Sequence, residues 1–263
     1  VDSVRRLLIS LSPNTSLKVT VMRNAVVTDC EIESQSIADD AWIRFPEGWG
    51  ADEDSGDVQR GGWEINDWKL PEAGNAAALA APKKVDGKRQ LGLLILLMNP
   101  GTGAPATVLE PWLKAAEECG VVVCAIAAED QQRWLPKEVD VIGRFATSMI
   151  KQFAIEPQAV AISTLGALAG GDGDAADSMT LAVALAQRQL FHGASVSIKA
   201  RPPRIRLPEN EGEGSFQLLL SLDKAETIPP WAKPLKKAGY PVVRAEDVDR
   251  FMLLRWVRLL QAI

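Results

Sequence analysis

The stretch from Ala159 to Leu185 constrains the fold of this 263-residue chain more than any other part of it. A run of apolar and β-branched residues predicts a short strand, a glycine-rich turn follows, and an alanine-rich run then predicts a helix. Asp174 and Asp177 lie in the first turn of that helix, where acids cap free N–H groups and complement the helix dipole. A strand that passes through a tight turn into a helix is one repeat of an α/β architecture.

The same alternation continues from Gln90 to the end of the chain. Continuous apolar strands separated by amphipathic helices predict a doubly wound α/β domain with a mostly parallel sheet covered on both faces. In such sheets, ligands bind at the carboxyl ends of the strands. The other predicted strands are 91–98, 121–127, 194–198, 216–222 and 241–244, and the other predicted helices are 107–119, 136–153, 230–238 and 246–262.

Composition excludes several classes of function. A net charge of −5 and a pI near 5.1 argue against a nucleic-acid partner. The longest apolar run, 91–98, is too short to span a membrane. The three cysteines, Cys30, Cys119 and Cys124, lack the spacing of metal ligands, and the single histidine is His192. We therefore predict neither a metal nor a cofactor.

The N-terminal residues predict a small α+β piece. Residues 2–11 have the periodicity of a short amphipathic helix, and 17–23 and 26–33 predict a hairpin that turns at Asn24-Ala25. Over residues 1–34, this helix and hairpin resemble the C-terminal half of a PDZ domain. PDZ domains accompany the protease domains of HtrA-type periplasmic proteases, so the resemblance implies an exported piece of a longer protein. The start at Val1, without an initiator Met, fits that expectation.

Residues 35–88 lack periodicity but carry Trp42, Trp49, Trp63 and Trp68. Burying an indole side chain is strongly favourable, so these tryptophans are expected to be packed. We therefore predict an irregular segment docked on the following domain, with a strand at 41–45. An aromatic platform for a ligand such as a carbohydrate is the alternative interpretation.

Several segments of 91–263 share one further resemblance. They are Asn99-Pro100-Gly101-Thr102-Gly103, Phe191-His192-Gly193-Ala194-Ser195-Val196, 216–223, and 236–242 followed by 254–256. They resemble the α/β-hydrolase family, in particular its esterase and dienelactone-hydrolase-like branch, which implies that fold for a domain at 89–263. Asn99, Gly101, Thr102 and Gly103 stand where the family has its oxyanion loop, so the resemblance implies that their backbone N–H groups face an oxyanion.

The residues that the resemblance would make catalytic are different here. In the strand–turn–helix of the nucleophile elbow, Leu168 takes the position of the serine. Asp223 is the carboxylate nearest the position of the acid, and the family's histidine is absent around Asp247. His192 is expected at the opposite edge of the sheet. The triad is therefore predicted to be degenerate, with no catalytic residue.

Two serines near the turn are weaker candidates for a nucleophile. A shifted turn would present Ser163, and Ser178 is expected on the surface of the following helix or against its neighbours. Neither has a histidine to act as its base, so we do not predict a serine site.

Two other groups are candidate ligand-binding residues. Asp172, Asp174 and Asp177, next to Gly171 and Gly173, suggest a divalent-cation loop, but further ligands of a calcium loop are missing, and helix capping is the simpler interpretation. Gly166 of the same turn is a further candidate ligand-binding residue. Arg201 and Arg204 are candidates for holding a carboxylate, with pairing to the glutamates of 209–213 as the simpler interpretation.

These observations predict a non-catalytic, hydrolase-like domain that binds a protein or peptide partner within a larger, HtrA-type serine protease protein. An active hydrolase, either an esterase or a peptidase, is the first alternative. Its atypical site would use Asp223, or the carboxylates of Asp172, Asp174 and Asp177, together with a metal ion or water. A Trp-rich ligand-binding module is the second.

Overall fold

The computed structural model describes residues 16–23, 26–33, 62–85, 90–168, 174–202, 216–222, 227–246 and 248–260. The chain divides into two compact units, residues 1–42 with 262–263 and residues 43–261. The larger unit carries the sheet and every candidate site residue that the structure describes.

The smaller unit contains an antiparallel hairpin of β1 (Ser16–Arg23) and β2 (Val26–Glu33). Exposed hydroxyls and carboxylates pair across it, as Thr20 Oγ1 donates to Asp29 Oδ1 at 2.7 Å. The predicted hairpin is confirmed. The predicted helix at 2–11 lies outside the described residues, so the PDZ resemblance stays a prediction.

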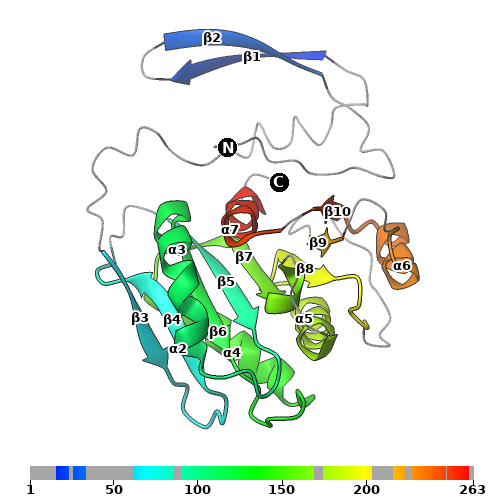
Figure 1. Ribbon diagram of the computed structural model, residues 1–263. Coiled ribbons are helices and arrows are strands. Elements are labelled where there is room, and N and C mark those ends of the chain that lie inside the picture. Colours follow the sequence, from blue (N-terminus) through cyan, green and yellow to red (C-terminus); the bar gives the residue numbers. More distant parts are fainter. Residues whose placement is uncertain are drawn as a thin grey trace. The chain divides into compact units, whose positions relative to one another are not determined.

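The larger unit is built on an eight-stranded sheet in the order β10-β9-β8-β7-β5-β6-β4-β3 (Figure 1). The strands are β3 (Trp63–Trp68), β4 (Ala77–Pro82), β5 (Leu91–Leu97), β6 (Val121–Ile126), β7 (Ile155–Thr164), β8 (Gly193–Ser197), β9 (Gln217–Ser221) and β10 (Val242–Ala245). Strands β5 to β10 pair in parallel, whereas β4 is antiparallel to both of its neighbours. The prediction of a mostly parallel sheet in an α/β fold is confirmed.

Strands β3 and β4 lie within the segment that the sequence analysis interpreted as irregular. The described part of that segment, 62–85, instead extends the sheet, and Trp63 packs against the core. The alanine-rich β4 has no alternation of apolar and polar residues that would predict a strand, because it is almost entirely buried. Its extended conformation is stabilised by pairing with the strands on both sides. Trp42, Trp49 and the predicted strand at 41–45 lie outside the described residues.

The helices are α2 (Pro105–Leu109), α3 (Leu113–Cys119), α4 (Glu138–Gln152), α5 (Asp174–Ala186), α6 (Lys233–Lys237) and α7 (Arg250–Leu259). The predicted helix at 107–119 is present but interrupted by a 3₁₀ turn, Glu110–Trp112. Pro111 explains the interruption, because proline has no N–H to donate. No helix in the described part of the chain combines the length and apolar character that a membrane crossing needs.

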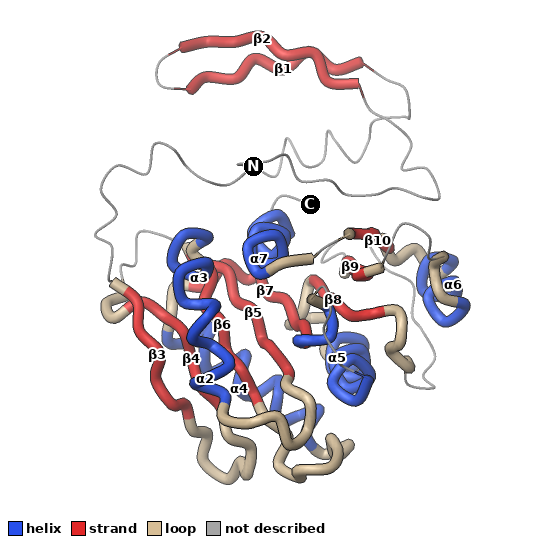
Figure 2. Tube along the Cα trace, viewed as in Figure 1, coloured by secondary structure: helices blue, strands red, loops and turns tan. Residues whose placement is uncertain are grey.

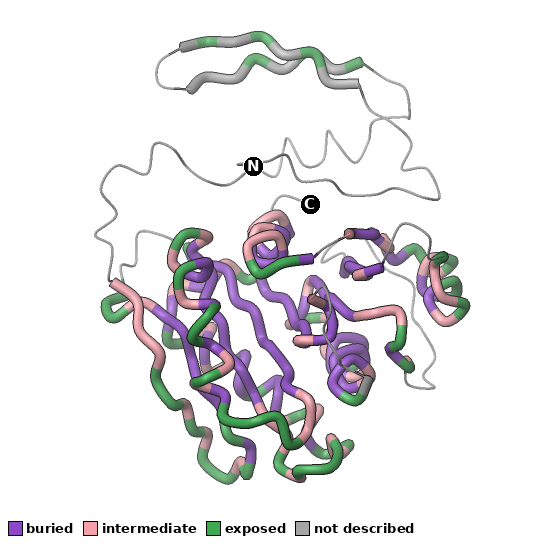
Figure 3. Tube along the Cα trace, in the orientation of Figure 1, coloured by how far each residue is buried: buried purple, intermediate pink, exposed green. Residues whose placement is uncertain are grey.

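The helices cover both faces of the sheet, as Figure 2 shows. Alternate residues of β5, such as Leu94 and Leu96, share an apolar cluster with α2, α3 and α7, which include the buried Trp256. The opposite face is covered by α4 and α5, which contact each other and β7. The central strands are coloured purple, for buried, in Figure 3. The core is therefore closely packed and excludes water, and a ligand site is expected at the strand ends.

Gly193 marks the closest approach of α7 to the sheet. A Cβ built on it would lie 2.6 Å from Trp256 Cη2 and 2.8 Å from Leu260 Cδ1. The indole cannot easily move, because its Nε1 donates to Gln217 Oε1 at 2.5 Å inside the core. We expect Gly193→Ala to lower the free energy of unfolding by about 1–3 kcal/mol in urea denaturation. Gly92→Ala is the matched control, since its nearest contact is 3.1 Å and its loss should be smaller.

Candidate functional site

The carboxyl ends of the parallel strands bring polar residues to one edge of the sheet. Thr164 ends β7 and Ser197 ends β8, which is the neighbouring strand. Asn99 follows β5, the neighbour of β7 on its other side. This edge is where doubly wound sheets place their ligands.

Asp177 of α5 joins the ends of β7 and β8. Its Oδ1 accepts a hydrogen bond from Thr164 Oγ1 at 2.6 Å, and its Oδ2 accepts one from Ser197 Oγ. Asp177 and Thr164 are fully buried, whereas Ser197 is half-buried. The sequence analysis interpreted Asp177 as a helix cap; in the structure its carboxylate instead turns inward to the sheet edge and binds two hydroxyls.

Each partner of this carboxylate has a distinct environment. Thr164 Oγ1 also accepts from Ala167 N at 3.2 Å, so that side chain is held on two sides. Ser197 Oγ accepts from Lys199 N at 3.3 Å. The Asp177 carboxyl group and the Lys199 N–H therefore both hold the serine hydroxyl in place. A partly exposed hydroxyl, a buried carboxyl group and a buried hydroxyl thus form one hydrogen-bonded chain.

The turn after β7 differs from the predicted elbow. Residues Leu165–Ala167 form a 3₁₀ turn that the Thr164 side chain caps, and Leu168 has an ordinary extended backbone with φ −81° and ψ 152°. Leu168 packs partly buried against the apolar cluster. A nucleophile position requires a strained backbone at the tip of the turn, which Leu168 does not have.

The loop after β5 is a glycine turn closed on Asn99. The Asn99 carbonyl accepts from Thr102 N at 3.2 Å and from Thr102 Oγ1 at 2.5 Å. Gly101 and Gly103 have φ values of 76° and 86°, which favour glycine. Because the Thr102 amide is used inside the turn, the amides of Gly101 and Gly103 are the candidate donors to an oxyanion.

Three of the other predicted site residues lie within the described part of the chain. Gly166 is buried in the 3₁₀ turn, and Arg201 is exposed, with its backbone N donating to Ser178 Oγ at 3.1 Å. Asp174 begins α5. The candidates that lie outside the described residues are Asp172, Arg204, Asp223 and Asp247.

The environments of Cys119, Cys124 and His192 do not favour a catalytic role for these residues at the carboxyl edge of the sheet. Burial raises the pKa of the Cys119 thiol to about 11 and that of Cys124 to about 12, which disfavours the thiolate. His192 immediately precedes β8, at the amino end of the strand, and its backbone N donates to Val160 O. Its predicted place at the opposite edge is confirmed.

Within the described ranges, no three His, Cys, Asp or Glu side chains lie close enough to hold a metal ion. Both oxygens of Asp177 are used by hydroxyls, which makes it a poor candidate for the cation site considered from the sequence.

Sequence reasoning missed Ser197 and the role of Thr164. Ser197 has no motif around it, since it ends an ordinary buried strand, GASVS. Only three features taken together could have predicted this group from the sequence. They are the two hydroxyls near the ends of consecutive predicted strands and the acid in the first turn of the helix between those strands.

Comparisons with known proteins give structural matches alone. No family model matches the chain, and no curated protein does. Among solved structures, an esterase of Rhizomucor miehei matches 76% of this chain and 84% of its own length, with a TM-score of 0.53 and 12% identity. A variant of esterase rPPE matches 77% of this chain and 83% of its own, with a TM-score of 0.51 and 11% identity.

A thermostable esterase is also matched, over 76% of this chain, with 15% identity and a TM-score of 0.48; this chain spans 60% of that protein's length. The fold is therefore the α/β fold of α/β-hydrolases, with a mostly parallel eight-stranded sheet in which β4 is antiparallel to both of its neighbours.

The matches correct the predicted function. The Rhizomucor miehei and rPPE structures are esterases and give no support to a PDZ-containing, HtrA-type protein. The prediction of a non-catalytic binding domain in such a protein is wrong, and the alternative of an active hydrolase is better supported. Export to the periplasm stays a prediction.

Proposed function

We propose that this chain is a carboxylic-ester hydrolase with Ser197 as its nucleophile and Asp177 as its base. The observation that carries the proposal is the hydrogen-bonded chain Ser197–Asp177–Thr164 at the carboxyl edge of the sheet. A nucleophile bonded to a base, which a third group orients, is the arrangement of covalent acyl transfer. The esterase fold of the structural neighbours supports the reaction class.

The reaction follows from these positions. Ser197 Oγ attacks the ester carbonyl carbon while its proton passes to Asp177, and the carbonyl oxygen becomes an oxyanion near the amides of Gly101 and Gly103. The bond to the alcohol oxygen then breaks, and that oxygen takes the proton from Asp177. Water hydrolyses the acyl-serine by the same route. A carboxylate is a weaker base than imidazole, so we expect slow turnover and a preference for activated esters such as p-nitrophenyl acetate.

Covalent capture tests the assignment. A fluorophosphonate probe should add its phosphonyl mass to the peptide that contains Ser197, and Ser197→Ala should abolish both this adduct and the hydrolysis of p-nitrophenyl acetate. Ser178→Ala is the matched control, because Ser178 is a serine of α5 next to Asp177 in the sequence, and its Oγ accepts from Arg201 N at 3.1 Å. It should be labelled like the wild type. Hydrolysis that Ser197→Ala leaves intact would contradict the assignment of the nucleophile, and a wild type without hydrolysis would contradict the function.

A further inference from the structure

The Asn99 side chain connects the loop after β5 to the helix that carries Asp177. Asn99 Oδ1 accepts a hydrogen bond from Ala176 N at 3.3 Å. Ala176 lies in the first turn of α5, where backbone N–H groups have no acceptor within the helix. Asn99 therefore supplies from another segment an acceptor that the helix needs, one residue before Asp177.

The main chain of the same residue closes the glycine turn. Its carbonyl oxygen holds both Thr102 N and Thr102 Oγ1, as described above. Gly101 and Gly103 of this turn have left-handed φ values, and glycine has many accessible backbone conformations. Without the bonds to the Asn99 carbonyl, the turn would therefore be more flexible. One residue thus fixes the turn with its carbonyl and the helix with its side chain.

We propose that Asn99 is a positioning residue that couples the 99–103 turn to the Asp177–Ser197 pair, an inference that rests on the proposed function. Acyl transfer requires the nucleophile, its base and the oxyanion donors to keep their separation to about 0.5 Å. The proposed donors lie on the turn and the proposed base lies on α5. Asn99 is hydrogen-bonded to a neighbour of each, to Thr102 in the turn and to Ala176 in the helix. Asn99 contacts no reacting atom; it acts through the residues it holds.

The consequence is a loss of turnover without a comparable loss of binding. A misplacement of about 1 Å costs on the order of 10²-fold in rate. We expect Asn99→Ala to lower kcat by about 10- to 100-fold, with KM changed less than about threefold. The Tm should fall by no more than about 4 °C, because a single partly buried hydrogen bond is lost. Asn99→Asp keeps an acceptor toward Ala176 and should restore most of the lost kcat.

Amide hydrogen exchange followed by NMR tests the coupling without any enzyme assay. In Asn99→Ala, exchange should accelerate at Ala176 on the helix and also at Thr102 in the turn. Thr102→Val removes only the hydroxyl bond within the turn, and so should accelerate exchange in the turn alone. Unchanged exchange at either Ala176 or Thr102 in Asn99→Ala overturns the proposal, as does an unchanged kcat. If the wild type hydrolyses no ester, the proposed function fails, and the exchange measurement still decides whether Asn99 couples the two segments.

Discussion

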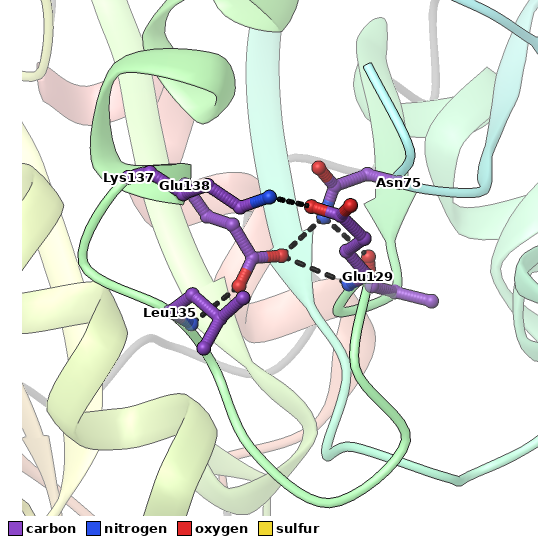
Figure 4. Close-up of polar contacts among 6 residues, drawn as sticks. Asn75, Glu129, Leu135, Lys137 and Glu138 are labelled. Carbon is purple, nitrogen blue, oxygen red and sulfur yellow. Dashed lines mark hydrogen bonds and ion pairs between the residues drawn. The ribbon is translucent and has the colours of Figure 1, made fainter.

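Replacing Glu138 by alanine is expected to lower the free energy of unfolding by about 3–5 kcal/mol, measured by urea denaturation. Glu138 begins α4 and is fully buried. Figure 4 shows its carboxylate at the centre of a cluster: Oε1 accepts from Asn75 Nδ2 at 2.5 Å and from Glu129 N at 2.9 Å, and Oε2 accepts from Leu135 N. The variant would leave three donors without their acceptor.

Two matched variants separate this effect from surface electrostatics. Glu138→Gln keeps one acceptor oxygen and replaces the other with a donor, so its loss should be intermediate. Lys137→Ala removes the exposed ion pair of Lys137 Nζ with Glu129 Oε2, 2.6 Å long, and should change the urea midpoint by a small fraction of the Glu138→Ala shift. An Ala variant as stable as the wild type would show that water replaces the carboxylate without cost.

The Glu138 cluster also holds the edge of the sheet together. Asn75 precedes β4 and donates a second bond to Ala127 O at 2.9 Å, while Leu135 lies in the loop between β6 and α4. In the same loop, Trp134 Nε1 donates to Met98 O at 3.1 Å, next to Asn99. These bonds connect the 127–135 loop to the residue before the glycine turn. The buried Glu138 carboxyl group is tolerated in the core because both of its oxygens are hydrogen-bonded.

The parallel strands and their helices were predictable because each is indicated by residues next to one another in the sequence. The continuous apolar run of β5 is short, which favours a buried strand over a helix. The run after Pro136 has both a helix start signal and a helical period. Strand β4 was not predictable in this way. Its run of alanines has no period of its own, and its antiparallel pairing with β6 joins residues far apart in the sequence, such as Ala78 and Ala125.

The candidate site was harder to predict for the same reason. An acid in the first turn of a helix predicts a cap, and Glu138 and Asp177 both occupy such positions. Both carboxylates instead bind groups that the fold brings from other segments, Asn75 in one case and Ser197 in the other. Only the strand order reveals these partners, and the strand order is a property of the whole sheet.

Asp177→Asn is the decisive variant for the chemistry, and we expect it to lower kcat for p-nitrophenyl acetate by about 10²- to 10⁴-fold. The amide keeps the shape of the side chain and an oxygen that accepts from Thr164 Oγ1. It no longer takes a proton from Ser197, because an amide is not a base at neutral pH. Thermal unfolding should show a folded variant, so the loss is assigned to chemistry.

Thr164→Val is the companion variant, since it removes the group that orients the base and leaves both Asp177 and Ser197 in place. Its kcat should fall by about tenfold, less than in Asp177→Asn, because orientation contributes less than the base itself. A reversed order of the two effects would mean that Thr164, and not Asp177, is the group on which proton transfer depends. Equal and full activity in both variants would remove the buried carboxylate from the mechanism, leaving the Ser197–Asp177–Thr164 chain as a structural tie between β7, β8 and α5.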